Sequence, residues 1–296
     1  MEKSIEKAGI LIEALPYIQS FQNKIVVIKL GGSTMSESGC DEGVLRDIVF
    51  MEAVKMKPVL IHGGGQAISR RMKEAGINPR FVVGLRMTDE KTIRIVQEVL
   101  SEINQGLVEK IISLKGRARS LNGVEKSVIK ASRHLPLVEG SGGESRSLDI
   151  GFVGEVSRVK PEAILKITRK EQIPVIAPLG KGEDGEVYNI NGDMAAGAIA
   201  SALKAEKLVF LTDVEGIMRK GEEDEKPQLL SSLRQKDIDN LLKEGVVEGG
   251  MIPKVKAGLR ALSAGVKKIH IIDGRIKHSL LLEIFTDKGI GTEIVK

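Results

Sequence analysis

Short apolar segments that end in glycine clusters recur along this chain and alternate with segments of helical spacing. Residues 24–30 (KIVVIKL) end at Gly31–Gly32, and residues 58–62 (PVLIH) end at Gly63–Gly65. Strands that alternate with helices form a mainly parallel sheet with helices on both faces. The pattern therefore predicts an α/β fold. It also places the glycine clusters beyond the carboxyl ends of strands, where ligands gather in such folds.

The same alternation continues to the end of the chain. The further elements that we expect are the strands 174–178, 207–212 and 268–272, and the helices 66–75, 92–114, 193–205 and 255–264. The polar, glycine-bearing stretch 124–149 favours hairpins or a flap. One literal G-x-G-x-x-G string lies at Gly180–Gly185, but a strand-like run follows it. A dinucleotide site needs a helix there, so we interpret the string as a hairpin turn.

The first 21 residues predict an amphipathic helix. Apolar side chains stand at helical spacing at Ile5, Ala8, Ile12, Leu15 and Ile18. Proline interrupts helical hydrogen bonding, so we expect Pro16 to bend or end this helix. The apolar stripe must be buried, either on its own domain or on another subunit. Acidic residues interrupt the segment, which argues against a secretory signal.

Composition excludes several classes of protein. Hydrophobic residues make up 42% and charged residues 29%, so a folded core is expected. No apolar run approaches the roughly 18 residues of a membrane span. The formal net charge of +5 is spread among both signs, and aromatic residues are only 3% with no Trp, so we expect no nucleic-acid binding. One cysteine and four scattered histidines predict no disulfide framework and no dedicated metal site.

Two lysines stand beside glycine pairs. Lys29 closes a strand before Gly31–Gly32, and Lys254 follows Gly249–Gly250 near the start of a helix. Glycine lets an anion approach the backbone closely, and helix N-termini attract it. Single glycine turns are common, but several such turns with two placed lysines favour an anion site. Either Asp193 or Asn191 caps the next helix, or Asp193 lies between the two lysines, and the two interpretations are compatible.

In order, the segments IKLGG (28–32), HGGG (62–65), GLRMTD (84–89), GFVGE (151–155), NINGD (189–193), LTDVEG (211–216) and GGMIPK (249–254) resemble the amino acid kinase family. The resemblance runs from about Lys24 to the C-terminus. It implies a three-layer αβα sandwich with a mainly parallel open sheet and two lobes. Residues 1–22 would be an oligomerisation helix, 23–180 a lobe that binds the amino-acid substrate, and 181–296 a lobe that binds ATP.

The resemblance also implies a reaction, the ATP-dependent phosphorylation of the γ-carboxylate of N-acetyl-L-glutamate in the cytoplasm. Such a transfer needs alignment and neutralised charge more than a general base. The implied catalytic residues are Lys29, Lys254 and Asp193. The implied substrate-binding residues are Gly31, Gly32, Gly63, Gly64, Arg86, Asn189 and Asn191, and the implied nucleotide-binding residues are Thr212 and Asp213. Mg²⁺ would be carried on the phosphates of ATP, because no cluster of acidic ligands is seen.

Two further segments are similar to the arginine-inhibited members of this family, which are hexamers built as trimers of dimers. One is the N-terminal helix and the other is HSLLLEIFTDKGIG (278–291). By this resemblance Tyr17, His278, Glu283 and Gly289 would lie near an arginine site. Some members also bind a signalling protein of the PII type. An ordinary C-terminal helix and strand would explain the second segment without any ligand.

Three alternatives stay open at this point. A sister kinase would act on a longer acylated diacid of the aminoadipate type, since one methylene is worth only about 1–3 kcal/mol of specificity. A non-catalytic arginine sensor could share the fold. A nicotinamide oxidoreductase rests on Gly180–Gly185 alone. The chain also departs from the family pattern at 117–126 and at Gly192, where alanine is common and where glycine could loosen Asp193.

Overall fold

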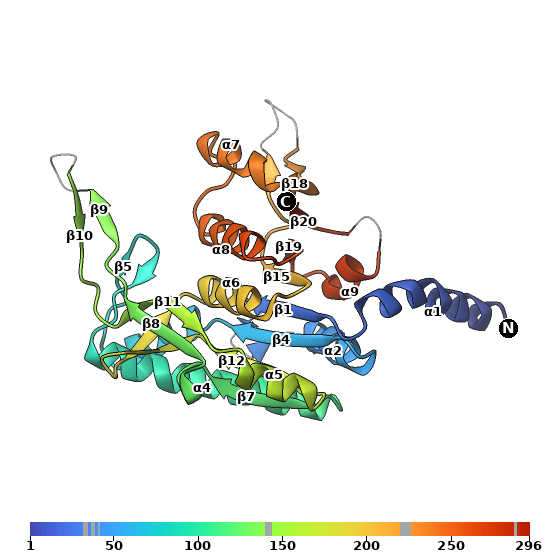
Figure 1. Cartoon of the computed structure of the whole chain (residues 1–296), viewed down its shortest axis with the longest axis horizontal. Helices are drawn as coiled ribbons and strands as arrows, with labels where there is room; N and C mark the ends of the chain where they lie inside the picture. Colours follow the sequence, from blue (N-terminus) through green and yellow to red (C-terminus); the bar gives the residue numbers. More distant parts are fainter. Residues whose placement is uncertain (32–34, 37–38, 41, 140–143, 220–225, 287–288) are drawn as a thin grey trace.

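The computed structural model describes residues 1–31, 35–36, 39–40, 42–139, 144–219, 226–286 and 289–296. An eight-stranded sheet runs through the molecule in the order β18-β20-β19-β15-β1-β4-β12-β7 (Figure 1). Its strands are β18 (Ser232–Arg234), β20 (Thr292–Val295), β19 (Lys268–Asp273), β15 (Lys207–Thr212), β1 (Ile25–Leu30), β4 (Lys57–His62), β12 (Ile173–Ala177) and β7 (Ala118–Asn122). The six strands from β19 to β7 are parallel to one another. Strand β20 pairs antiparallel with β19, and β18 pairs parallel with β20, so these two strands run opposite to the other six.

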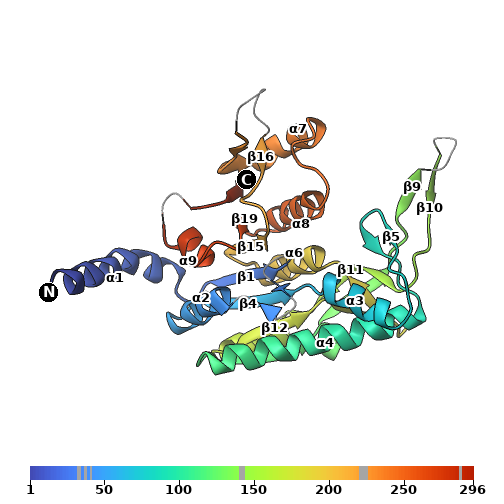
Figure 2. The same ribbon diagram turned by 180° about the vertical axis from the view of Figure 1, so that it is seen from behind.

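Helices cover both faces of this sheet, because its central strands are apolar on both sides. Successive side chains of a strand point to opposite faces. Val27 accordingly packs in one core with α5 (Glu162–Arg169), α6 (Gly192–Leu203) and α8 (Met251–Ser263). Its neighbours Val26 and Ile28 pack in another core with α2 (Glu42–Ala53), α4 (Glu90–Ser113) and α9 (Ser279–Ile284). The predicted three-layer αβα sandwich with a mainly parallel sheet is confirmed (Figures 1 and 2).

The smaller elements lie around this sandwich. Four strands close into a small barrel, namely β8 (Ile129–Arg133), β11 (Val153–Val159), β13 (Leu179–Gly182) and β14 (Val187–Ile190). Two-stranded pairs are formed by β2 (Met35–Ser36) with β3 (Gly39–Cys40), β5 (Phe81–Val82) with β6 (Leu85–Arg86), β9 (Leu137–Glu139) with β10 (Ser145–Ser147), and β16 (Met218–Arg219) with β17 (Gln228–Leu229). Helices α3 (Gly65–Glu74) and α7 (Ile238–Lys243) and two short 3₁₀ turns (Glu125–Ser127 and Gln235–Asp237) complete the described chain.

The expected elements are present, with ends that differ from the expected ones by at most four residues. The interpretation of Gly180–Gly185 as a hairpin turn is confirmed, because β13 pairs antiparallel with β14 across it. Hairpins are also found in the stretch 124–149, where β9 and β10 pair antiparallel and project from the body of the molecule (Figure 1). The positions 140–143 in this stretch lie outside the described residues.

Helix α1 (Glu2–Phe21) extends away from the rest of the molecule, with the N-terminus at its far end (Figures 1 and 2). The expectation that Pro16 could end it is wrong, since the helix continues to Phe21. Proline removes one hydrogen bond, but its φ near −65° is itself helical. The ring of Tyr17 lies 6.5 Å from that of Phe285, whereas Ile5 and Ile12 are 65% and 69% exposed. In the described part of the chain, no helix has the length and apolar character that crossing a membrane requires.

Candidate functional site

The carboxyl ends of the parallel strands meet at one edge of the sheet, and the glycine clusters follow them there. Gly31 continues β1, and the Gly63–Gly65 loop continues β4. The amide of Gly63 donates to the carbonyl oxygen of Leu30 at 3.0 Å, which ties the second loop to the end of β1. Helix α6 also begins at this edge, because β14 leads directly into it. The edge therefore gathers backbone N–H groups from several segments that are distant in sequence.

A charged cluster is buried at this edge. The carboxylate of Asp193 accepts two ammonium groups: Oδ1 lies 2.9 Å from Lys29 Nζ, and Oδ2 lies 3.2 Å from Lys254 Nζ. Lys254 Nζ also donates to the carbonyl oxygen of Gly250 at 3.1 Å. Lys29 comes from β1, Asp193 from the first turn of α6 and Lys254 from the first turn of α8. The fold thus holds two positive groups at a fixed separation across one carboxylate.

The cluster keeps one uncompensated positive charge. Burial acts to raise the pKa of Asp193, but the charges of Lys29 and Lys254 outweigh it and hold that pKa below the usual value. Asp193 is therefore ionised, and two ammonium groups against one carboxylate leave a net charge of +1. Lys29 is only 8% exposed and Asp193 only 5%, so water screens this charge weakly. An anion that enters the site would be bound by it.

The Lys29 ammonium group occupies the space that a side chain at residue 31 would need. A Cβ atom at residue 31 would overlap the Lys29 ammonium group, so a side chain there would displace the cluster. Among the other predicted glycines, Gly64 precedes α3 and presses against Leu100, because a Cβ at residue 64 would come within 2.7 Å of Leu100 Cδ2. Gly63 and Gly64 thus present bare backbone at the start of a ten-residue helix, where an anion is favoured. Gly32 lies outside the described residues.

Arg86 is a buried guanidinium at the end of β6. Its Nη2 donates to the carbonyl oxygen of Gly65 and to Ser69 Oγ, both at 2.8 Å, and its Nη1 approaches Met72 Sδ at 3.1 Å. The side chain is 7% exposed, and burial lowers its pKa. Within the described ranges no carboxylate lies at ion-pair distance from Arg86. A buried positive charge without a counter-charge is costly, so the site favours an anionic ligand here.

Asn189 and Asn191 lie on either side of the β14–α6 junction. Asn189 is half-buried in β14, next to Val153 of β11. Asn191 caps α6, since its Oδ1 accepts from the amides of Asp193 at 2.9 Å and Met194 at 3.1 Å. The N-cap interpretation thus holds for Asn191, and the cap fixes the first turn of α6, which carries Asp193.

Gly192 lies in the first turn of α6, directly before Asp193. A Cβ at residue 192 would meet Lys29 Cε at 3.4 Å and the His62 carbonyl oxygen at 3.7 Å, which are ordinary contacts. We expect Gly192→Ala to stabilise the protein by about 0.5–1 kcal/mol, because alanine loses less backbone entropy on folding. Thermal denaturation should show a small rise in Tm with kcat unchanged. A fall in Tm would show that the first turn of α6 does not tolerate a methyl group.

Thr212 and Asp213 lie at the end of β15, at the same edge of the sheet. Thr212 Oγ1 donates to Asp213 Oδ1 at 3.2 Å, and the Gly274 amide donates to the Thr212 carbonyl oxygen at 2.9 Å. Thr212 is buried and pairs with Asp273 of β19. Thr212 and Asp213 therefore lie at the part of this sheet edge that β15 and β19 form.

The four residues of the predicted arginine site are only partly brought together. A Cβ at Gly289 would come within 2.8 Å of Glu283 Oε2, so these two are in contact. Tyr17 packs on Phe285, and His278 Nδ1 lies 2.6 Å from Asp47 Oδ1 on helix α2.

The sequence reasoning missed the partner of Glu283. His270 Nδ1 lies 2.6 Å from Glu283 Oε1, and both side chains are buried. Burial acts to raise the pKa of Glu283, but the hydrogen bond and the charge of His270, together with hydrogen bonds from the amides of Ile290 and Gly291, outweigh it and lower that pKa. The sequence feature that indicates this pair is His270 within the largely apolar run KIHII (268–272), and His270 has no metal-ligand spacing to the other histidines.

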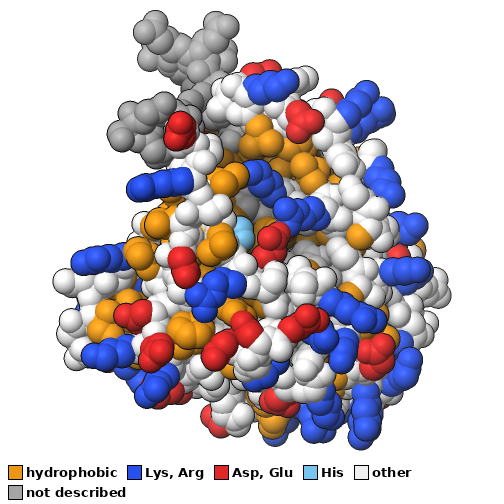
Figure 3. Space-filling view, turned by 60° about the vertical axis from the view of Figure 1, so that its left-hand side comes forward, with side chains coloured by type: hydrophobic (Ala, Val, Ile, Leu, Met, Phe, Trp, Pro, Cys, Tyr) orange, Lys and Arg blue, Asp and Glu red, His pale blue; other side chains and the backbone are white. Residues whose placement is uncertain are grey.

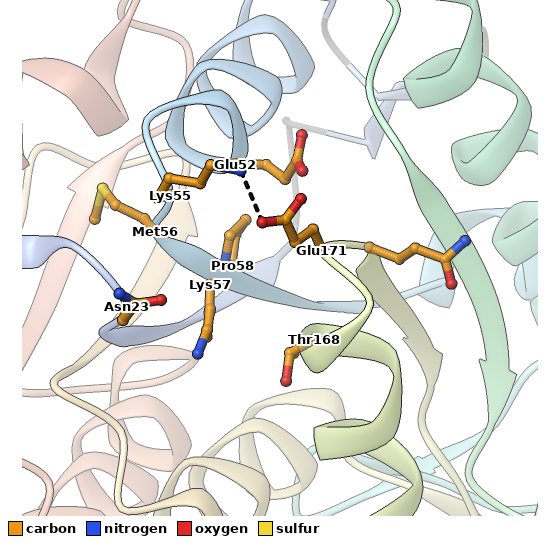
Figure 4. A pocket seen from close by; sticks show the side chains of 9 residues that line it. Asn23, Glu52, Lys55, Met56, Lys57, Pro58, Thr168 and Glu171 are labelled. Atoms are coloured by element: carbon orange, nitrogen blue, oxygen red, sulfur yellow. Dashed lines mark hydrogen bonds and ion pairs between the residues drawn. The ribbon is translucent and has the colours of Figure 1, made fainter.

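A cavity of about 30 Å³ lies at the opposite edge of the sheet, where β1, β4 and β12 begin (Figure 4). Three of its charged side chains are held in ion pairs. Lys55 Nζ lies 2.7 Å from Glu171 Oε1, and Arg117 joins Glu171 to Glu52 at 3.0 and 2.6 Å. The cavity has room for little more than a water molecule. The cavity is a structural feature of the sheet edge at which β1, β4 and β12 begin.

Charges of both signs are interspersed over the face of the molecule that Figure 3 shows. In the space-filling view, basic side chains (blue) alternate with acidic ones (red) across the whole face (Figure 3). A nucleic-acid interface would gather basic side chains on one surface instead. The Lys29–Asp193–Lys254 cluster carries its net positive charge in a buried position, where it can act on a small anion.

Comparisons with known proteins agree with this arrangement. A model of the amino acid kinase family matches residues 24–273. A protein of Heliobacterium modesticaldum named acetylglutamate kinase is 49% identical over 297 residues, and the match covers 100% of both chains. One of the same name from Aquifex aeolicus is 47% identical over 308 residues, covering 99% of each. Among solved structures, N-acetylglutamate synthase from Neisseria gonorrhoeae, complexed with coenzyme A and N-acetyl-glutamate, shares the fold. Its TM-score is 0.80 at 24% identity, covering 98% of this chain and 63% of that one.

Proposed function

Because this chain belongs to the amino acid kinase family, we propose that it transfers the terminal phosphoryl group of ATP to the γ-carboxylate of N-acetyl-L-glutamate. The products are N-acetyl-L-glutamyl 5-phosphate and ADP. The full-length relatives named acetylglutamate kinase support this choice of substrate. The single observation that carries the chemistry is the buried Lys29–Asp193–Lys254 cluster with its net positive charge.

The reaction needs charge neutralisation and alignment. A γ-carboxylate oxygen forms a bond to the γ-phosphorus, the bond from that phosphorus to the bridging oxygen breaks, and ADP leaves with the electron pair. The attacking carboxylate is already ionised at neutral pH, so no general base has to take a proton. Negative charge shifts toward the leaving oxygen during transfer, and ammonium groups fixed beside the phosphoryl group stabilise it. We assign that role to Lys29 and Lys254, with Asp193 as the positioning residue for both.

The acceptor has a second carboxylate that needs its own partner. Two N–H groups of Arg86, on Nη1 and Nε, have no protein acceptor in the portion of the chain that the structure describes. We assign the buried guanidinium of Arg86 to the α-carboxylate of the acceptor, because charge-assisted hydrogen bonds from arginine to a carboxylate are strong. Gly31, Gly32, Gly63 and Gly64 would donate backbone N–H groups to the transferring phosphoryl and to the γ-carboxylate, and Asn189 would bind the acetylated end.

The described acidic side chains and histidines also indicate how Mg²⁺ would enter the site. Among the described residues, no three His, Cys, Asp or Glu side chains gather into a cation site. Asp193 is already engaged by two lysines. We propose that Mg²⁺ enters on the phosphates of ATP, where it would neutralise part of their charge. Thr212 and Asp213 at the end of β15 would contact the nucleotide, and residues 181–296 would form its lobe beside the acceptor lobe of 23–180.

The proposal is tested by incubating the purified protein with Mg-ATP and a panel of acylated diacids. Hydroxylamine traps an acyl phosphate as a hydroxamate, and a coupled assay follows ADP. We expect turnover with N-acetyl-L-glutamate and at least about tenfold lower kcat/KM with the aminoadipate homologue, as one methylene in a fitted pocket allows. A preference for the longer diacid would replace the substrate assignment, and absence of any turnover would favour a non-catalytic role.

We also propose that L-arginine inhibits the enzyme by binding beside Glu283 and Gly289. The carboxylate of Glu283 is ionised, and its Oε2 accepts from the amides of Ile290 at 2.7 Å and Gly291 at 3.2 Å. A ligand guanidinium beside it would gain a charge-assisted contact. The resemblance to arginine-inhibited members supports the assignment, and the Glu283–Gly289 contact is compatible with it.

Glu283→Gln should raise the inhibition constant for L-arginine by about tenfold or more, because the variant removes the charge that attracts a guanidinium. The amide oxygen can still accept from the Ile290 and Gly291 amides, so kcat without arginine should stay at the wild-type level. The measurement is ADP release against arginine concentration, with Glu244→Gln on the exposed surface as the matched control. Equal inhibition of both variants would place the arginine site elsewhere.

Helix α1 supports a proposal on assembly. Its exposed Ile5 and Ile12 would be buried against another copy of the chain, in an oligomer that the resemblance suggests is a hexamer. Ile5→Glu combined with Ile12→Glu should therefore lower the mass measured by light scattering, while kcat is kept because the site lies in the body of the molecule. An unchanged mass would remove α1 from the interface. A partner of the PII type and a cytoplasmic location stay predictions.

A further inference from the structure

His62 and Asn104 form a buried polar pair beneath the Gly63–Gly65 loop. His62 ends β4 and is completely buried, and Asn104 lies in the middle of α4 and is 2% exposed. Polar side chains are mostly exposed in proteins and, where buried, are hydrogen-bonded, so the partners of this pair show what it holds in place. The loop above them is the one to which the proposed function assigns the contacts with the phosphoryl group.

The hydrogen bonds of this pair determine where each proton lies. Asn104 Nδ2 is 2.9 Å from the carbonyl oxygen of Val175 in β12, and a carbonyl can only accept, so this atom is the amide nitrogen. The same Nδ2 lies 3.1 Å from His62 Nε2. Since Nδ2 is a donor in both contacts, Nε2 must be the unprotonated ring nitrogen. The proton is then on Nδ1, which lies 3.0 Å from the carbonyl oxygen of Gly63 and donates to it.

The state of the ring is compatible with this arrangement. Burial lowers the pKa of His62 to about 4, so the imidazole is neutral at neutral pH and carries a single N–H. That one N–H is directed at the backbone of the loop. The Gly63 peptide is thus held from two sides, because its amide donates to Leu30 and its carbonyl accepts from His62.

The same helix supports the next residue of the loop. Leu100 and Ile103 of α4 contact the bare Cα of Gly64, where a Cβ would come within 2.7 Å of Leu100 and 3.2 Å of Ile103. One turn of α4 therefore packs against Gly64 with apolar side chains and fixes Gly63 through Asn104 and His62. Backbone donors that act in phosphoryl transfer have to be preorganised, since a misplacement of about 1 Å can cost on the order of 100-fold in rate.

We propose that His62 and Asn104 are positioning residues that hold the Gly63 peptide in the orientation in which the following N–H groups face the transferring phosphoryl group. The proposal rests on the proposed function, because it assigns these residues to the same transfer. Neither side chain is placed in contact with substrate, and their effect acts through the loop.

Two substitutions of similar size separate the two ends of the imidazole. In His62→Asn the side-chain amide can occupy the place of Nδ1 and keep the donor to Gly63. In His62→Gln the amide reaches the place of Nε2 and keeps the contact with Asn104, but it leaves the Gly63 carbonyl without its donor. We expect kcat to stay within about fivefold of wild type in His62→Asn and to fall by about 100-fold in His62→Gln, as the loss of one preorganised donor costs. KM for ATP should change little in either.

The readouts distinguish positioning from stability. Both variants should lower Tm by similar amounts, so a difference in kcat between them cannot come from folding alone. His134→Gln, a half-exposed histidine of the β8 end, serves as the control and should keep wild-type kcat. Equal losses of kcat in the two His62 variants, or wild-type kcat in both, would overturn the proposal. A wild-type protein that turns over no acylated diacid would instead refute the proposed function.

Discussion

Lys254→Ala is expected to lower kcat by about 1000-fold while leaving the fold intact. The ammonium group of Lys254 lies 3.2 Å from Asp193 and supplies one of the two positive charges of the cluster. Its removal leaves Lys29 neutralised by Asp193, so the site loses its net positive charge and with it the stabilisation of the passing phosphoryl group. A factor of 1000 corresponds to about 4 kcal/mol of transition-state stabilisation, within the range for fixed cationic groups in phosphoryl transfer.

A matched control is available on the same helix. Lys256 is exposed and lies two residues farther along α8, so Lys256→Ala removes the same charge from the protein without touching the cluster. Steady-state kinetics should show wild-type kcat for this control. If Lys254→Ala retained more than about a tenth of wild-type kcat, Lys254 would not act on the transition state, and the catalytic charge would have to come from elsewhere.

Arg86→Met is expected to raise KM for N-acetyl-L-glutamate by about 100-fold. Loss of a charge-assisted carboxylate contact in a buried site costs about 2–5 kcal/mol. The effect should appear mainly in KM, because the α-carboxylate of the acceptor is bound equally in the ground state and the transition state. Arg86 also donates to Gly65 and Ser69, so a smaller fall in kcat is expected as the start of α3 relaxes.

Arg94→Met controls for the loss of an arginine from this part of the chain, since Arg94 is exposed on α4. Arg86→Lys adds a second comparison, because it keeps the positive charge but loses the planar fork that suits a carboxylate. We expect its KM to lie between those of wild type and Arg86→Met. An unchanged KM for the acceptor in Arg86→Met would remove Arg86 from the substrate site and leave it with the structural contacts alone.

Much of the fold could be predicted, because each central strand can be recognised from its own short stretch of sequence. Apolar runs such as 207–212 (KLVFLT) are buried on both faces of a parallel sheet, and the glycines that follow them mark their ends. The lysines and Asp193 could be singled out for the same reason, since each lies at the boundary of a local element. The length of α1 could not be predicted, because Pro16 indicates a break, whereas a proline removes only one helical hydrogen bond and its φ is itself helical.

Contacts between distant segments carry no such local signal. Asn104 lies within a long amphipathic helix, 42 residues from His62, and looks there like one polar position among others. The pairing of His270 with Glu283 depends on the packing of α9 on β19. Side chains of this kind become recognisable only once the fold has brought the burial and the partner together, because a buried polar group needs a hydrogen-bonding partner and an exposed one does not.

The close approach of Lys29 to Gly31 limits how this protein can vary. The volume that a methyl group at residue 31 would fill is already occupied by the ammonium group, so even the mildest exchange at this position acts on charge placement as well as on shape. Residues 29 and 31 are therefore coupled: a side chain at residue 31 would displace the ammonium group from Asp193, so a redesign that moves the cationic group has to change both residues together.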